Sequence, residues 1–382
     1  MLTFLKYMLL ALVSTMIVML IFLSCEKDTL TWNDPHPAGR PAAVISSINP
    51  DTAYAGETVT ITGTDFSTTL DENLVFFGKT KAQVISSSET TLEVSVPPGG
   101  GKELVTVDVK IAKQGALNWS NLVNFTYSPV IENLLSISDL SGICMGVAVD
   151  EEGNLYWTEG KSKLVKWKPG GEMTVIHEGH AYNNGMPYIG PDGLIYACGC
   201  GMLFSYNLDG TVVDTVALDP FPWSYAWDSQ GTLYFSHWGI DRYNGDGTAT
   251  TISERYRSGE VVIYNDYAYI IKSRSDTLFK YQINNGTLGA PDVIKLDVAD
   301  PGKPRPDQLC MDSEGTIYYR NAGVSALYYI KSDGSRGKMF EGELSPSHKA
   351  QMHGKFMYLT GCGAGDDDKL QKVYIGVEGI KY

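Results

Sequence analysis

The sequence predicts an all-β protein built from an N-terminal immunoglobulin-like sandwich and a C-terminal β-propeller. The first observation is a tyrosine that recurs about every 40 residues, the period of a four-stranded propeller blade. The second is that most copies follow an acidic, glycine-containing turn between two alternating apolar runs, which is the pattern of a β-hairpin. The third is a separate stretch of short alternating strands over residues 44–127. The recurring residues are Tyr156, Tyr196, Tyr234, Tyr269, Tyr318 and Tyr358.

Residues 1–24 have the pattern of an export signal. Lys6 precedes an apolar stretch from Met8 to Leu23, and the sequence Leu23-Ser24-Cys25 follows it. This segment resembles a lipoprotein signal peptide, which implies cleavage before Cys25 and lipidation of that cysteine. The residues 26–28 resemble the surface-export signals of Bacteroidota lipoproteins, which implies an outer-membrane protein exposed at the cell surface. An uncleaved membrane anchor is the alternative.

Residues 25–43 are predicted to be the lipidated cysteine and a flexible tether, because the segment is polar and contains Pro35, Pro37 and Pro41 without apolar periodicity. Residues 44–127 then carry alternating runs such as Thr58–Thr62 and Thr91–Val96, separated by glycine and proline turns. About 85 residues of short strands suit an immunoglobulin-like sandwich. With Ile48-Asn49-Pro50, Val59 to Phe66 and Val75 to Gly78, this segment resembles the IPT/TIG family, which implies a spacer without catalytic residues.

The propeller is predicted over residues 128–382. Small residues stand two positions before the turn aspartate in four copies, as expected where innermost strands converge on a channel: Ala148, Gly190, Ala226 and Cys310. In the copy around Tyr269 the small residue is replaced by Tyr264, and the copy around Tyr358 has no turn aspartate. The units resemble NHL-type repeats, and the length of the segment fits six blades of about 42 residues.

Composition limits the partners. The chain has 382 residues, 43% of them hydrophobic and 19% charged, and its formal net charge is −14. Such an acidic chain is an unlikely match for nucleic acid, so no nucleic-acid partner is expected. Cys198 and Cys200 are not accompanied by a second Cys or His pair that would complete a zinc site, so no metal is expected. No cofactor is expected either. Cys310 is expected to be a buried apolar residue, and Cys144 and Cys362 could pair across the first and last blades.

The functional site is expected on the propeller face where the loops entering the inner strands meet the loops between second and third strands. Aromatic rings there can stack on sugars, and planar polar groups can hydrogen-bond vicinal hydroxyls. The candidate ligand-binding residues are Tyr182, Asn183, Asn184, Trp223, His237, Trp238, Tyr256, Asp307, Gln308, Arg320 and Asn321. Packing of Trp223 and Trp238 between blades is the alternative.

An enzyme would need an acid, a base or a metal at the same mouth, and the candidates are His237, His348 and Asp307. The sequence contains none of the compact hydrolase or metalloprotease motifs. The order of anchor, tether, sandwich and propeller resembles surface lipoproteins associated with SusC/SusD-like importers. That resemblance implies a non-catalytic protein that captures polysaccharide or oligosaccharide for such a transporter. The alternatives are a propeller-type polysaccharide lyase or hydrolase, and a protein-interaction scaffold at the outer membrane.

Overall fold

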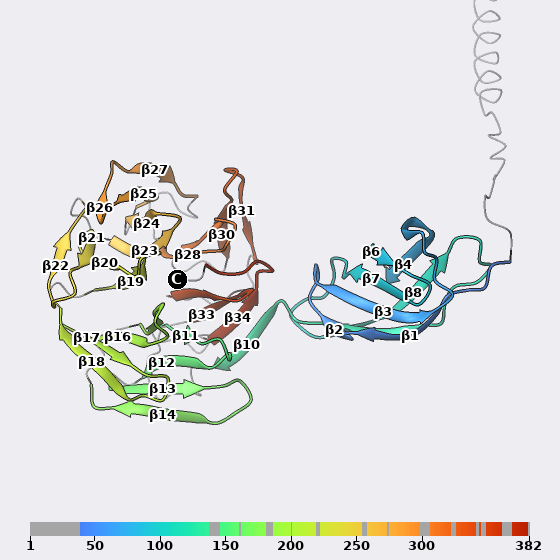
Figure 1. The fold of residues 1–382 in the computed structure, drawn as a ribbon, viewed down its shortest axis with the longest axis horizontal. Helices are drawn as coiled ribbons and strands as arrows, with labels where there is room; N and C mark the ends of the chain where they lie inside the picture. The colour runs from blue at the N-terminus through green and yellow to red at the C-terminus, as the bar shows by residue number, and fades with distance from the viewer. Residues whose placement is uncertain are drawn as a thin grey trace, which may run out of the picture. The chain divides into compact units, whose positions relative to one another are not determined.

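The structure, a computed structural model, consists of two compact β units (Figure 1). The first unit comprises the described chain up to Pro98 together with Thr106–Thr126, and the second comprises Gly99–Val105 and the chain from Tyr127 onward. The structure describes residues 39–136, 146–159, 162–180, 186–199, 201–218, 222–253, 258–272, 275–297, 306–321, 326–340, 344, 349–360 and 369–380. No helix within these ranges is long and apolar enough to cross a membrane.

The first unit is a sandwich of two antiparallel sheets. Its strands alternate between buried and exposed residues, and Phe77 meets Phe125 edge to face between the sheets at a centroid distance of 4.9 Å. One sheet has the order β1-β3-β7-β6 and the other β2-β9-β8-β4-β5, with the short 3-10 helix η1 at Leu70–Glu72. The strands are β1 Val44–Asn49, β2 Thr52–Ala53, β3 Thr58–Thr64, β4 Asn73–Phe77, β5 Thr80–Lys81, β6 Gln83–Ser87, β7 Thr91–Ser95, β8 Val105–Lys113 and β9 Val123–Tyr127.

The second unit is a six-bladed propeller, in agreement with the fold predicted from the repeat (Figure 1). The first three blades are β11 Ala148–Val149, β12 Leu155–Glu159, β13 Lys163–Trp167 and β14 Met173–Glu178; then β15 Tyr188–Ile189, β16 Ile195–Gly199, β17 Met202–Tyr206 and β18 Val212–Ala217; then β19 Ser224–Trp227, β20 Leu233–Ser236, β21 Ile240–Tyr243 and β22 Ala249–Thr251.

In the fourth blade β25 pairs with both of its outer neighbours, and the sixth blade takes its outermost strand from the start of the unit. These blades are β23 Ser258–Tyr264, β24 Tyr267–Lys272, β25 Thr277–Asn284, β26 Thr287–Leu288 and β27 Asp292–Lys295; then β28 Pro306–Met311, β29 Ile317–Asn321, β30 Leu327–Ile330 and β31 Arg336–Met339; then β32 Lys349–His353, β33 Phe356–Thr360, β34 Lys369–Tyr374 and β10 Ile131–Ser136.

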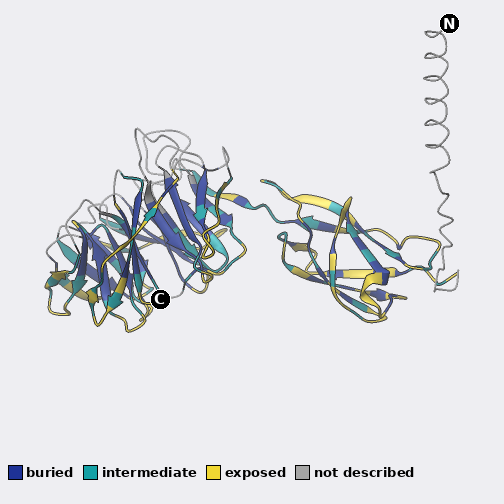
Figure 2. Ribbon diagram, turned by 90° about the horizontal axis from the view of Figure 1, so that it is seen from above, coloured by how far each residue is buried: buried dark blue, intermediate teal, exposed yellow. Residues whose placement is uncertain are grey.

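Apolar clusters between neighbouring blades hold the propeller together. Each cluster joins residues of two successive blades, and the cluster containing Trp157 and Trp167 of the first blade also contains Tyr358 and Leu370 of the last. Buried residues accordingly fill the strands of the ring, while exposed ones gather at its rim (Figure 2). The ring closes at the sixth blade, where β10 from the start of the unit pairs antiparallel with β34 from its end. The apolar cluster between the first and last blades lies at the same junction.

In four of the six blades the repeat tyrosine is explained by a hydrogen bond inside the hairpin. In the first blade the Asp150 carboxylate accepts the backbone N–H of Glu152 and Asn154, at 3.0 and 2.8 Å, and the Tyr156 hydroxyl at 2.8 Å. Glycine at position 153 has φ of +79°, which glycine adopts without strain. The same arrangement recurs with Asp228 and Tyr234, at 3.0 Å, and with Asp312 and Tyr318, at 2.9 Å.

The pKa of Asp150 and the pKa of Tyr234 both depart from their ordinary values. Burial alone would raise the pKa of Asp150, but the hydrogen bonds from Asn154, Tyr156 and Glu152 outweigh it and lower that pKa. Burial, followed by the nearby carboxylate, raises the pKa of Tyr234 to about 12. At neutral pH Asp150 of the first blade is therefore ionised, and Tyr234 of the third blade is protonated.

Two details of the predicted repeat are wrong. Gly190 is not the small residue opposite the repeat tyrosine, because Tyr188 pairs with Tyr196. Gly190 instead occupies the turn, where a side chain would meet the Tyr196 ring at 2.6 Å, and Asp192 receives the Tyr196 hydroxyl at 2.6 Å. In the fourth blade the residue opposite Tyr269 is Val262 rather than Tyr264.

We expect Asp150→Asn to lower the free energy of unfolding by about 1–3 kcal/mol at pH 7, because a buried charge-assisted network loses its negative charge and one of its two acceptor oxygens. The folded-state pKa of Asp150 lies below its ordinary value of 3.8, so its contribution is complete above that pH and fades as the pH falls below it. Urea unfolding at pH 7 and pH 3 should therefore show a smaller difference between mutant and wild type at pH 3. The exposed neighbour substitution Glu151→Gln is the control; an equal effect at both pH values would contradict the prediction.

Candidate functional site

The third blade brings three of the predicted binding residues together. Trp223 lies just before β19 and donates its backbone N–H to the Ser236 carbonyl at 2.8 Å. This bond continues the pairing of β19 with β20 up to the loop that precedes β19. His237 and Trp238 form the turn between β20 and β21. The rings of Trp223 and Trp238 are 5.7 Å apart between centroids, and His237 lies 5.6 Å from Trp223 and 6.0 Å from Trp238. An entering loop and a second-to-third-strand loop therefore meet, as the sequence predicts.

Exposure distinguishes the members of this aromatic cluster. Trp238 is 47% exposed, whereas Trp223 and His237 are partly buried beneath and beside it. A half-exposed indole that is fixed by two other rings offers a flat apolar surface at small entropic cost. The cluster can therefore stack against a flat ligand without rearranging.

Gln308 and Arg320 come together but lie in the interior. They are opposite each other on β28 and β29, and they are 0% and 1% exposed. In this structure their polar groups face the protein rather than solvent, so direct contact with a ligand would require the neighbouring loops to move. They are better placed to support the inner strands than to recognise a sugar from the surface.

The structure does not describe the side chains of the remaining predicted residues. Tyr182, Asn183, Asn184, Tyr256 and His348 lie outside the described residues, and Asp307 and Asn321 are described only in their backbone. Cys25, Cys144, Cys200 and Cys362 also lie outside the described residues.

A group of polar residues that the sequence analysis did not identify ties the inner strands together. The Glu260 carboxylate of β23 accepts the Tyr188 hydroxyl and the Leu309 backbone N–H, both at 3.1 Å. Ser224 of β19 in turn accepts the backbone N–H of Val261 at 3.2 Å and lies 3.4 Å from the Tyr188 hydroxyl. Four successive blades are thus connected around the channel through buried hydrogen bonds. The available signal was Tyr188, at a position where three other copies have the small residues Ala148, Ala226 and Cys310.

A small cavity lies beside this network. Its volume of about 20 Å³ suits a single water molecule, and its lining includes Tyr188, Glu260, Gln351 and Ile380. The chain after β34 crosses this end of the channel. The Glu378 carbonyl accepts the backbone N–H of Ser313 at 2.7 Å, and Ile380 lines the cavity. The cavity is too small for a sugar.

Neither described cysteine is suited to chemistry. Cys310 is buried, as the sequence predicts, and burial raises the pKa of its thiol well above the ordinary value. Burial likewise raises the pKa of the Cys198 thiol to about 12. Both thiols therefore stay protonated at neutral pH. Across the described ranges, no group of three or more His, Cys, Asp or Glu side chains is arranged to hold a metal ion.

The fold and the site define the chain as an IPT/TIG domain followed by a six-bladed β-propeller that carries an aromatic cluster on one face. Residues 43–127 match the model of the IPT/TIG domain family. No curated protein matches the sequence.

Solved structures with a similar fold match most of this chain. A protein of unknown function from Bacteroides thetaiotaomicron is 13% identical, with a TM-score of 0.53, and the match covers 89% of this chain and 99% of that one. An auxiliary nutrient binding protein from Bacteroides ovatus is 13% identical, with a TM-score of 0.51, and the match covers 90% and 100%. A gluconolactonase from Xanthomonas campestris is 15% identical, with a TM-score of 0.52 and coverage of 64% and 89%. At these identities the similarity establishes the fold.

We expect Glu260→Ala to lower the free energy of unfolding by about 1–3 kcal/mol, because it leaves buried donors of Tyr188 and Leu309 without their acceptor. Denaturant unfolding measures the change. Glu260→Gln, which keeps an acceptor oxygen, should lose less. Equal losses in the two variants would show that the carboxylate does not act through these hydrogen bonds.

Proposed function

We propose that this protein is a non-catalytic cell-surface lipoprotein that captures polysaccharide or oligosaccharide for a SusC/SusD-like importer. The aromatic cluster of Trp223, His237 and Trp238 carries the proposal, because a half-exposed indole supported by two further rings is a surface on which a sugar ring can stack. Binding of this kind needs no acid, base or metal.

The order of domains supports the proposal. The Bacteroides ovatus protein with the same two units is named an auxiliary nutrient binding protein, and it matches nearly the whole of both chains. The acidic net charge of −14 favours a neutral glycan over a polyanionic one. A single stacking platform gives weak affinity, so a polysaccharide would be retained through several such contacts along its length.

The proposed location is the outer membrane, with lipidated Cys25 as the anchor and residues 26–39 as the tether. The apolar stretch from Met8 to Leu23 followed by Cys25 supports this location. A surface position would place the propeller where soluble polysaccharide arrives. Delivery to a transporter would then be a transfer between neighbouring membrane proteins.

We expect Trp238→Ala to weaken binding of the cognate oligosaccharide about tenfold, equivalent to about 1.4 kcal/mol, because the exposed stacking surface is removed. Calorimetry of residues 26–382 against a panel of neutral and acidic glycans measures the affinity, and product analysis of the same mixtures tests for cleavage. Trp238→Phe should retain most of the binding.

The matched control is Trp119→Ala, which removes an equally exposed tryptophan from the other unit. Unchanged affinity in Trp238→Ala would show that the glycan binds elsewhere. Cleaved products would overturn the non-catalytic assignment, and no binding to any glycan in the panel would favour a protein partner.

We expect Cys25→Ser to move the protein from the membrane fraction to the soluble fraction, because no residue remains to accept the lipid. Fractionation and metabolic labelling with a fatty-acid analogue give the measurement. Cys198→Ser, at a buried thiol, is the control. If the Cys25→Ser protein stayed in the membrane fraction, the apolar stretch itself would be the anchor.

A further inference from the structure

The loop between β8 and β9, residues 114–122, exposes apolar side chains on the IPT/TIG sandwich. Leu117 is 84% exposed, Leu122 is 58% exposed and Trp119 is 50% exposed. Single exposed apolar residues are ordinary, whereas three in one nine-residue loop mark a contact surface. Trp119 lies edge to face with Phe76 at a centroid distance of 5.6 Å, and the Lys110 ammonium lies 4.4 Å from the centre of its ring.

Hydrogen bonds hold this loop in place. Ser120 is buried and exchanges bonds with Ile111 of β8, through its backbone N–H and its hydroxyl, both at 2.9 Å. The Asn121 side chain pairs with both backbone groups of Ile45 on β1, at 2.8 and 2.9 Å. The exposed residues between and beside these two points are therefore presented by a fixed loop rather than by a mobile one.

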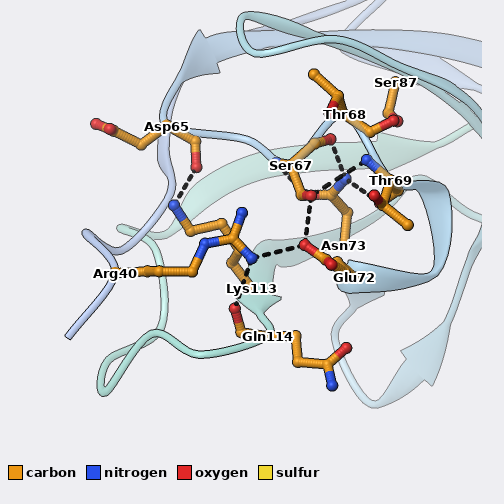
Figure 3. Close-up of polar contacts among 10 residues, drawn as sticks. All are labelled: Arg40, Asp65, Ser67, Thr68, Thr69, Glu72, Asn73, Ser87, Lys113 and Gln114. Carbon is orange, nitrogen blue, oxygen red and sulfur yellow. Dashed lines mark hydrogen bonds and ion pairs between the residues drawn. The ribbon is translucent and has the colours of Figure 1, made fainter. Parts of the chain in front are cut away.

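The chain from the N-terminal tether reaches the sandwich at the same loop. The Arg40 backbone N–H donates to the Gly115 carbonyl at 3.2 Å, and Arg40 forms a parallel bridge with Ala116. Its guanidinium bonds the buried Glu72 carboxylate at 2.6 Å and the Gln114 carbonyl at 3.3 Å (Figure 3). The Ser67 hydroxyl also donates to the Glu72 carboxylate, at 2.5 Å, and so holds this carboxylate in position for Arg40. Tension on the tether would therefore act directly beside the exposed loop.

The tether sets how far this loop can be from the membrane. The fourteen residues 26–39 separate Cys25 from Arg40 in the sequence. Fully extended, they span at most about 50 Å, at about 3.3–3.6 Å per residue. Lipidation of Cys25 would thus keep the β8–β9 loop at a high effective concentration next to the bilayer.

We propose that the β8–β9 loop docks on the lipid bilayer surface, with Leu117 and Leu122 entering the headgroup–acyl boundary and Trp119 at the interface. Tryptophan favours this boundary because its ring is apolar while its N–H can bond water or headgroups. Lys110, above the ring, is placed to meet lipid phosphates. A weak second contact of this kind complements a single lipid anchor. This inference rests on the anchor in the proposed function.

The test uses the full chain reconstituted in phosphatidylcholine vesicles with brominated acyl chains, which quench nearby tryptophan. Trp32 in the tether is first replaced by phenylalanine, so that it cannot report. We expect this background to be quenched relative to unbrominated vesicles. The further substitution Trp119→Phe should abolish the quenching. Leu117→Ser should weaken it, and Val293→Ser, which removes an exposed apolar side chain from the propeller strand β27, should leave it unchanged.

Flotation of the same vesicles separates the two proposals. A protein that does not float with the vesicles overturns the anchor and the loop contact that depends on it. A protein that floats while its tryptophan fluorescence is insensitive to bromine overturns the loop contact alone. Quenching that persists in Trp119→Phe would also overturn it, because another tryptophan would then be the one at the membrane.

Discussion

The bond between the turn aspartate and the repeat tyrosine determines how the hairpins of four of the six blades are built. One carboxylate satisfies two backbone N–H groups of the turn and the tyrosine hydroxyl from the following strand, as Asp312 does for Glu314, Thr316 and Tyr318. A buried carboxylate is stable only when its lone pairs are satisfied, so turn and strand must form together. The tyrosine ring then enters the apolar cluster between blades. In these blades a local hydrogen bond thereby links the turn to the apolar packing between neighbouring blades.

Much of the fold could be predicted because this bond leaves a regular trace in the sequence. Aspartate, glycine and tyrosine recur at fixed offsets, and the alternating runs around them identify the strands. The errors arose where the offsets change. At Gly190 the aspartate has moved two residues toward Tyr196 while the bond is kept, so a fixed position does not identify the residue facing the tyrosine. In the fourth blade no aspartate sets the register, and Tyr264 instead donates its hydroxyl to the Ser313 carbonyl of the next blade.

The candidate site was less predictable, because loops from different parts of a blade meet only in three dimensions. Propeller geometry brought Trp223, His237 and Trp238 together as expected, since the period alone places their loops on one face. The exposure of a side chain could not be inferred in the same way. Gln308 and Arg320 were predicted to bind a ligand at this face, yet both side chains lie in the interior. Glu260 went unnoticed because a lone glutamate in a degenerate repeat has no distinguishing pattern, and only the packing of four inner strands gives it partners.

The two units use aromatic residues under opposite constraints, and this difference bears on how the protein works. In the propeller, Trp238 is half-exposed and lies against the rings of Trp223 and His237, so the proposed glycan would meet a preformed surface. In the sandwich, Trp119 is exposed on a loop that buried polar groups hold against β1 and β8, beside the residue where the tether arrives. The proposed capture on the propeller would be repeated and reversible, because weak stacking releases a ligand quickly. The proposed membrane contact of the loop would be renewed by the tether, because even weak affinity suffices when a lipid anchor prevents the surface from diffusing away.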